Sequence, residues 1–304
     1  MNRKRILPAL LCLLAVLLCG CGVQGTYANA DRYTAGDARI TGAVDSLDIH
    51  WIDGSVKILY DEDNAVRLEE TASRKLSADE KLHWWLDGTT LRVQYAASGS
   101  RFAFSMKKQL IVYLPAGTVL KDASVSATSG SIHANPLHAA QIRLKTTSGS
   151  IESYSGASSI LAESTSGSIA LTAAANQVTL NATSGNIHAV IEHAEELKIN
   201  TTSGAVQADA REARDVRIHS TSGRVVLNQQ TMPETIQLAS TSGGAALAVP
   251  GDAGFTAEIS TTSGRVDMAL PAKKTGNRYV CGDGSAQVSI HSTSGNVSVA
   301  AFQP

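Results

Sequence analysis

The sequence predicts an all-β protein that folds as a β-solenoid, similar to a parallel β-helix, with coils of about 19 residues. The tripeptide Thr-Ser-Gly occurs nine times, and successive copies lie 18 to 21 residues apart except for one gap of 31 residues. Around each copy apolar and polar residues alternate, and the alternation changes phase at the glycine. A short fixed period is typical of repeat proteins, in which each unit buries its apolar face only by stacking on its neighbours.

The phase change predicts a corner at each glycine. Apolar residues occur seven and five positions before it, as at Leu197 and Ile199, and two and four positions after it, as at Val225 and Leu227. Alternation marks a strand with one buried face, so a change of parity indicates that the chain turns. We expect the glycine to have a positive φ, the serine to point inward with its hydroxyl bonded to a neighbouring coil, and the threonine to point outward. The predicted corner glycines are Gly54, Gly130, Gly149, Gly167, Gly185, Gly204, Gly223, Gly243, Gly264 and Gly295.

The first residues predict a lipoprotein signal peptide. A basic start and a short apolar run precede Leu18-Cys19-Gly20-Cys21, which resembles a bacterial lipobox. A plain secretory signal has the same general shape, but the ending favours lipidation of Cys21. We therefore assign residues 1–20 to the signal peptide and residues 21–30 to a tether. The protein is expected to be extracytoplasmic and held at the membrane by the lipid on Cys21.

Residues 31–115 predict an aromatic-rich β segment that caps the solenoid, whose coils occupy residues 116–304. A cap would cover strand edges that otherwise invite aggregation. Around Gly54 the spacing of apolar residues matches the coil pattern, which predicts a diverged tenth coil. Residues 82–95 predict a hairpin, since Asp-Gly favours a tight turn between strands. The turn-rich insertion at residues 272–277 is a candidate for a second cap.

The cysteine count predicts no intrachain disulfide in the mature protein. Cys12 and Cys19 would leave with the signal peptide and Cys21 would carry lipid, so Cys281 remains alone. We expect Cys281 to be a structural thiol, with a reactive thiol as the alternative.

The N-terminal block with Trp51-Ile52-Asp53-Gly54, the strand at residues 109–115 and the serial Ser-Gly-x-Ile coils resemble the DUF4097 family of β-strand-repeat proteins, often labelled adhesins. The resemblance covers nearly all of the mature chain. It implies a β-helical fold and a cell-envelope setting, and it supplies no catalytic residues.

The outward columns of the predicted coils show no catalytic, cofactor or metal site. Three residues after the glycine, no two acidic residues are adjacent, as a polysaccharide-cleaving site would require. Four residues before it, Lys145 and Glu163 can pair across coils. His133 and His188 share one column and His219 and His291 the other, in each case three coils or roughly 14 Å apart, too far for one metal ion.

The sequence favours a non-catalytic structural or adhesin-like module of the cell envelope, with an envelope protein or glycan as partner. The net charge of −1, from 26 basic and 27 acidic residues, gives no electrostatic case for nucleic acid. The alternative is a sensor that binds an envelope ligand or responds to stress through the aromatic segment, with Trp84 and Trp85 as the candidate binding residues. A polysaccharide-active β-helix enzyme is the third possibility.

Overall fold

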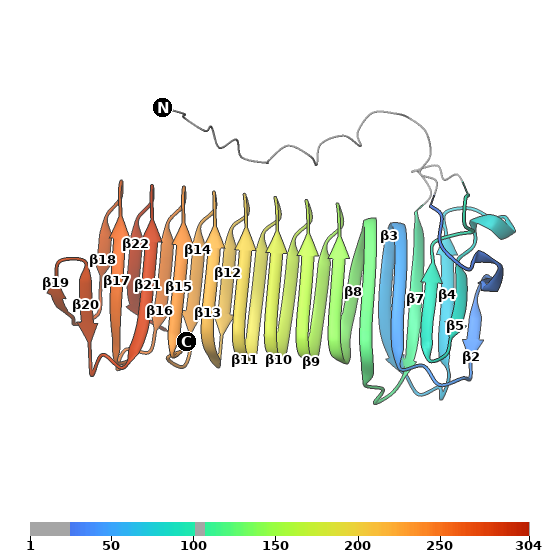
Figure 1. Cartoon of the computed structure of the whole chain (residues 1–304), viewed down its shortest axis with the longest axis horizontal. Helices are drawn as coiled ribbons and strands as arrows, with labels where there is room; N and C mark the ends of the chain where they lie inside the picture. Colours follow the sequence, from blue (N-terminus) through green and yellow to red (C-terminus); the bar gives the residue numbers. More distant parts are fainter. Residues whose placement is uncertain (1–24, 101–106, 304) are drawn as a thin grey trace, which may run out of the picture.

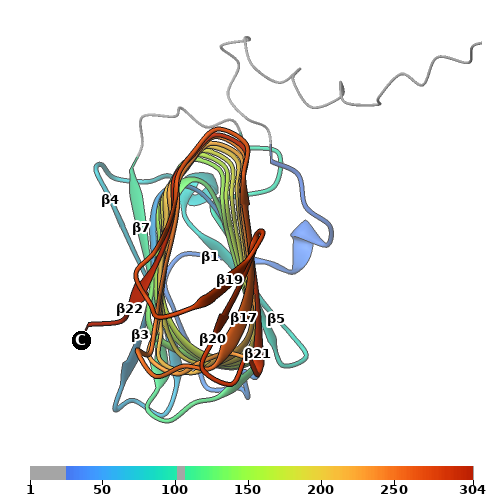
Figure 2. The same ribbon diagram turned by 90° about the vertical axis from the view of Figure 1, so that its left-hand side faces the viewer.

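The computed structural model describes residues 25–100 and 107–303 of the 304-residue chain. The predicted signal peptide, Cys21 and the first part of the tether lie outside the described residues. The described chain is an elongated β-solenoid whose strands run across its long axis (Figure 1). Seen along that axis, the coils superpose as a flattened outline with two long sides (Figure 2). The predicted fold class is confirmed.

The elements divide into an N-terminal cap and a stack of coils. The cap and the first coil contain η1 (Ala30–Arg32), β1 (Thr34–Ala35), β2 (Ala38–Ile40), β3 (Ser46–Asp61), β4 (Val66–Ala72), η2 (Ala78–Glu80), β5 (His83–Asp87), β6 (Thr90–Gln94) and β7 (Lys108–Pro115). The central coils contain β8 (Leu120–Thr146), β9 (Ile151–Ser164), β10 (Ile169–Ala182), β11 (Ile187–Thr201), β12 (Val206–Ala210), β13 (Ala213–Ser220), β14 (Val225–Gln229), β15 (Thr235–Ser240) and β16 (Ala245–Val249). The C-terminal end contains β17 (Phe255–Thr261), β18 (Val266–Met268), β19 (Lys273–Thr275), β20 (Arg278–Cys281), β21 (Ala286–Ser292) and β22 (Val297–Ala301).

Each coil contributes one segment to each of two parallel sheets. The segments that precede the corner glycines pair with one another, as Asn181 in β10 pairs with Asn200 in β11, and we call this the pre-corner sheet. The segments that follow the glycines form the post-corner sheet, as where Ile187 in β11 pairs with Val206 in β12. The register keeps equivalent residues of successive coils side by side. Apolar side chains therefore stack in continuous rows between the sheets.

The N-terminal cap extends each sheet with one parallel strand followed by antiparallel strands. On the pre-corner side β6 runs parallel to β3 and forms a hairpin with β5, which pairs with β1. On the post-corner side β7 runs parallel to β3 and pairs with β4, which pairs with β2. The hairpin predicted at residues 82–95 is confirmed. Gly54 lies opposite Gly130 in the register, so β3 supplies the first coil of the stack.

The order of the coils in space departs from the order in the sequence at the C-terminal end. β21 pairs with β15 on one side and with β17 on the other, and β22 likewise lies between β16 and β18. The coil that contains Gly295 therefore lies between those of Gly243 and Gly264 (Figure 1). The β19–β20 hairpin then pairs with the outer edge of β17, at the insertion predicted as a second cap.

Candidate functional site

Most corners have a hydroxyl side chain three residues before the glycine. Thr146 is 1% exposed; its hydroxyl donates to the carbonyl oxygen of Gly130 (3.1 Å) and accepts the N–H of Gly149 (3.0 Å). Ser164 and Thr201 accept the N–H groups of their own corner glycines in the same way. At these three corners the hydroxyl thus satisfies a backbone group that the turn would otherwise leave buried without a partner.

Two expectations about the corners are wrong. The threonine of Thr-Ser-Gly is mostly exposed, as expected, but the serine is exposed too and does not point inward. The N–H groups of both bond to carbonyl oxygens of the adjacent corner, as where Ser203 donates to Thr183 (2.8 Å). Among the ten corner glycines, all in the described residues, Gly54 has a positive φ (+98°) and the other nine do not. Eight of these nine, from Gly149 onward, are needed for space, because the carbonyl oxygen of the corner stacked against each lies only 1.8–2.3 Å from where its Cβ atom would be. At Gly130 the corresponding oxygen, that of Gly54, is 3.3 Å away. Close backbone approach, and not left-handed geometry, explains the repeated glycine.

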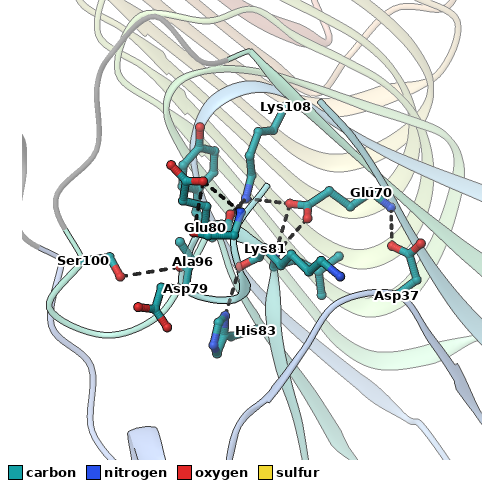
Figure 3. A network of polar contacts seen from close by, with 12 residues as sticks. Asp37, Glu70, Asp79, Glu80, Lys81, His83, Ala96, Ser100 and Lys108 are labelled. Carbon is teal, nitrogen blue, oxygen red and sulfur yellow. Dashed lines mark hydrogen bonds and ion pairs between the residues drawn. The ribbon is translucent and has the colours of Figure 1, made fainter. Parts of the chain in front are cut away.

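A buried polar network ties the N-terminal cap together. The side chains of Lys108 in β7 and Glu70 in β4 are 0% and 4% exposed, and Lys108 Nζ lies 2.6 Å from Glu70 Oε1. The same ammonium donates to the carbonyl oxygens of Glu80 (2.6 Å) and Tyr95, so three acceptors surround it (Figure 3). Glu70 in turn accepts the N–H of Leu82. The network joins β4, β7, η2 and the ends of β5 and β6, which suits a structural clamp.

The aromatic rings around the clamp make its environment apolar. Lys108 Nζ lies 4.1 Å from the ring centroid of Tyr95 and 5.2 Å from that of Trp51, at distances typical of cation–π contacts. Burial lowers the pKa of Lys108, and the pairing with Glu70 opposes this effect. Burial also raises the pKa of Tyr95. At the surface of the same loop, bonds from Arg74 and the Ser77 N–H lower the pKa of Glu80 to about 2.

The two candidate tryptophans lie next to each other on β5 but have different roles. Both are half-buried, and Trp84 packs against the hydrophobic core. Trp85 instead contacts the ring of Tyr33 edge-on, with centroids 5.7 Å apart, and Arg32 lies 5.4 Å from the Trp85 ring. Tyr27 continues this group, with its ring centroid 4.7 Å from that of Tyr33. Residues Tyr27, Tyr33 and Trp85 thus form an aromatic cluster at the N-terminal end.

A row of polar side chains crosses the pre-corner sheet beside the corners. It contains Lys145, Glu163, Asn181, Asn200 and His219, which are adjacent in the register; we call them the polar row. Asn200 Nδ2 donates to Asn181 Oδ1 (2.9 Å), Asn181 Nδ2 donates to Glu163 Oε1 (3.2 Å), and Lys145 Nζ lies 3.6 Å from Glu163 Oε2. These bonds fix the orientation of the two amides.

The polar row lines a groove that reaches the aromatic cluster. Along most of its length the groove is bounded by the polar row and by the threonines of the corners, such as Thr183 and Thr202. At Lys145 it meets a second depression, which is lined by Tyr27, His50 and Gln94 among others. The groove therefore runs parallel to the long axis, across successive coils, from the cap toward the middle of the stack.

Sequence comparison identifies the family. The model of the DUF4097 family, described as Toastrack DUF4097, matches residues 44–300. The chain belongs to this family. No curated protein matches its sequence.

Three solved structures resemble this DUF4097 chain at low identity. A Clostridium sporogenes protein provisionally named for cell adhesion is 11% identical, with a TM-score of 0.23, and the match covers 88% of this chain and 99% of that one. A Parabacteroides distasonis protein provisionally named for lipid binding is 15% identical, with a TM-score of 0.48 and coverage of 87% and 96%. A Bacteroides fragilis protein provisionally named an adhesin is 13% identical, with a TM-score of 0.39 and coverage of 89% and 97%.

The histidines of this DUF4097 chain are dispersed along the coils. His133 and His188 lie three coils apart as expected, but insertion of the C-terminal coil leaves His219 and His291 two coils apart instead of three. Within residues 25–100 and 107–303, no group of three or more His, Cys, Asp or Glu side chains is placed to hold a metal ion. In the same ranges no helix is long and apolar enough to cross a membrane.

Cys281 lies on β20 in the C-terminal hairpin and is 3% exposed. It is a free thiol opposite Phe255 of β17, and burial raises its pKa. A thiol in this environment is poorly ionised at neutral pH, which disfavours the reactive alternative.

Sequence reasoning missed the clamp and the hydrogen-bonded chain from Asn200 through Asn181 to Glu163, which we call the amide ladder. Lys108 occurs in a strand pattern, where a lysine is normally expected to point to solvent, and nothing nearby in the sequence pairs it with Glu70. Aligning the coils on their glycines did place Lys145 beside Glu163. The same alignment contained the signal for the ladder, because Asn181 and Asn200 occupy that column in successive coils.

Proposed function

We propose that this DUF4097 protein is a non-catalytic interaction module of the cell envelope, anchored by lipid on Cys21 and presenting an elongated binding surface. The observation that carries the proposal is the groove along the pre-corner sheet, where the polar row repeats hydrogen-bonding groups from coil to coil. A surface of this kind suits a long or repetitive partner, because each coil adds a further polar side chain at the same position. The fold supports the same role, since stacked coils hold these groups at a fixed spacing.

Binding to isolated bacterial envelopes tests the proposal. The full chain, purified in detergent, should co-sediment with envelope fragments, and removing residues 186–204 should weaken binding only modestly. This deletion joins Gly185 to Ala205, keeps the coil pattern in phase and shortens the stack by ~4.8 Å. If the shortened protein keeps its circular dichroism spectrum but loses all binding, the proposal that binding is distributed over many coils is wrong. If the intact protein does not bind envelopes, the proposal that it is an interaction module is wrong.

The membrane anchor is tested separately. Cys21→Ser should release the protein from the membrane fraction or leave its precursor unprocessed, and it should abolish incorporation of a labelled fatty acid. Cys281→Ser serves as the control, since it removes another cysteine and should leave the label unchanged. Equal label in Cys21→Ser and in the original protein would contradict lipidation.

A second candidate function is sensing of an envelope ligand through the aromatic cluster. The observation that favours it is the packing of Tyr27, Tyr33 and Trp85 on the outer side of the cap, with Arg32 over one ring. Trp85→Ala should then abolish binding while the deletion of residues 186–204 has no effect. If binding is instead distributed along the groove, the deletion of residues 186–204 should weaken it modestly and Trp85→Ala should have the smaller effect.

A further inference from the structure

We infer that the groove binds a linear polysaccharide of low charge, with the sugar chain lying along the solenoid axis. This inference rests on the proposed function and names the chemical class of its partner. It is argued from the hydrogen-bonding capacity of the polar row, from the charge balance of the groove, from the pairing of the sheet beneath it and from the aromatic cluster at its end.

The amide ladder leaves a regular set of hydrogen-bonding groups for a ligand. An asparagine side chain has two N–H donors and two acceptor lone pairs. Asn181 uses one donor on Glu163 and one lone pair for Asn200, which leaves one of each. Because the ladder fixes these amides, binding would cost little side-chain entropy. Sugar hydroxyls donate and accept hydrogen bonds and match this mixed set.

The spacing of the groove suits a polymer of sugar rings. Equivalent residues of successive coils are separated by ~4.8 Å, and one pyranose ring advances an extended glycan by a similar distance. Five coils contribute to the polar row, from Lys145 to His219. The corner threonines on the same side, such as Thr183 and Thr202, add hydroxyls with the same repeat.

The charges of the groove disfavour a strongly charged polymer. Lys145 lies 3.6 Å from Glu163, and these two charges offset each other. The other members of the row are two amides and a histidine. Outside the groove, charges pair across coils, as do Arg217 with Glu196 (2.5 Å) and Arg214 with Glu234 (3.0 Å). A uniform field, which a polyanion would require, is therefore not present along the polar row.

The sheet beneath the groove disfavours a peptide strand. Binding of a peptide by β-augmentation requires a free strand edge. The segments that carry Glu163, Asn181 and Asn200 are each paired with a parallel neighbour on both sides. A ligand in the groove can thus reach side chains but not backbone groups of the sheet, which suits a polyhydroxylated chain.

The aromatic cluster provides a place for sugar stacking at one end of the groove. Tyr27 lines the depression that adjoins Lys145 and contacts Tyr33, whose ring in turn meets Trp85. Aromatic rings offer a flat apolar face, and tyrosine and tryptophan add a polar tip. The C–H faces of a pyranose ring can pack against such a surface while its hydroxyls reach the polar row.

The test measures binding of defined oligosaccharides to the full chain in detergent by calorimetry. The probes are β-1,4-linked oligomers of glucose and of N-acetylglucosamine with two to eight units, and oligogalacturonate is the charged comparison. For at least one neutral series, affinity should rise with length and level off near the number of coils in the polar row. The variant Asn181→Ala/Asn200→Ala should bind the longest oligomer at least tenfold more weakly.

Asn228→Ala is the matched control, because Asn228 donates to Asp209 across coils of the opposite sheet and should not affect binding. Thermal unfolding of each variant shows whether the fold is retained. Absence of binding by both neutral series would overturn the inference, as would equal loss in Asn228→Ala or tighter binding of oligogalacturonate. If envelope binding persists in such a case and is abolished by protease treatment of the envelopes, the partner is a protein and the proposed module survives without the polysaccharide.

Discussion

The carbonyl oxygen of Gly185 occupies the space that a Cβ atom on Gly204 would need, far inside van der Waals contact. The same relationship links each Thr-Ser-Gly corner from Gly149 onward to the corner stacked before it. Neither glycine has a positive φ, so the requirement is steric and comes from the neighbouring coil. Each corner thereby limits the residue that the next corner can use.

Gly204→Val should destabilise the protein locally, by roughly 3 kcal/mol, because the side chain forces adjacent corners apart. Hydrogen exchange around residues 180–225 should increase, with smaller changes in more distant coils. Ser203→Val is the control, since Ser203 is exposed and its Cβ is already accommodated. Unchanged exchange in Gly204→Val would contradict the close approach of the corners.

Ala182→Ser should stabilise the protein by about 1 kcal/mol. Ala182 lies three residues before Gly185, at the position where Thr146 and Thr201 bond the corner backbone in other coils. A serine here can accept the N–H of Gly185 and donate to Gly167, as Thr146 does between Gly149 and Gly130. Urea unfolding measures the gain, and Ala182→Val, which adds bulk without the hydroxyl, should give none.

Lys108→Met should destabilise the cap by about 3–5 kcal/mol, because it leaves the carboxylate of Glu70 buried without its partner. Adding Glu70→Gln should recover part of this loss, since the amide oxygen can still accept the N–H of Leu82. A double-mutant cycle measured by urea unfolding checks the coupling. Strictly additive effects would show that the pair does not act as a unit.

Gln229→Met should increase the free energy of unfolding by about 1 kcal/mol. Gln229 is 0% exposed at the end of β14, and neither atom of its amide has a hydrogen-bond partner among the described residues. Methionine has a similar size, and its thioether does not leave a buried amide without hydrogen-bond partners. Gln207→Met, at an exposed site of the neighbouring coil, should change stability little. Destabilisation by Gln229→Met would mean that the amide is satisfied in solution.

Cys281 should react with a thiol reagent at least tenfold more slowly in the folded protein than in urea. It is buried, and its raised pKa reduces the thiolate that attacks the reagent. Reaction at pH 8, followed by absorbance and corrected with Cys281→Ser, gives the rate for this residue. A rapid reaction of the folded protein would indicate that the β19–β20 hairpin opens readily.

The repeat and its alternation determined the solenoid, its coil length and the positions of the corners from the sequence alone. These features are local and repeat many times, so each coil confirms the pattern of the others. The same alignment placed Lys145 beside Glu163, as the register later shows. It also located the glycines correctly, although the expected positive φ holds at Gly54 and is wrong for the other nine.

Only the tertiary structure decided why eight of the glycines are needed, how Lys108 reaches Glu70, and where the last coil lies. Each depends on a contact between segments far apart in sequence: Gly204 with Gly185 in the adjacent coil, Lys108 with β4 and η2, and β21 between β15 and β17. A pattern of alternation specifies which side of a strand is buried, but many stacking orders satisfy the same pattern. The choice among them is made by the packing and hydrogen bonding of whole coils, which no single stretch of sequence contains.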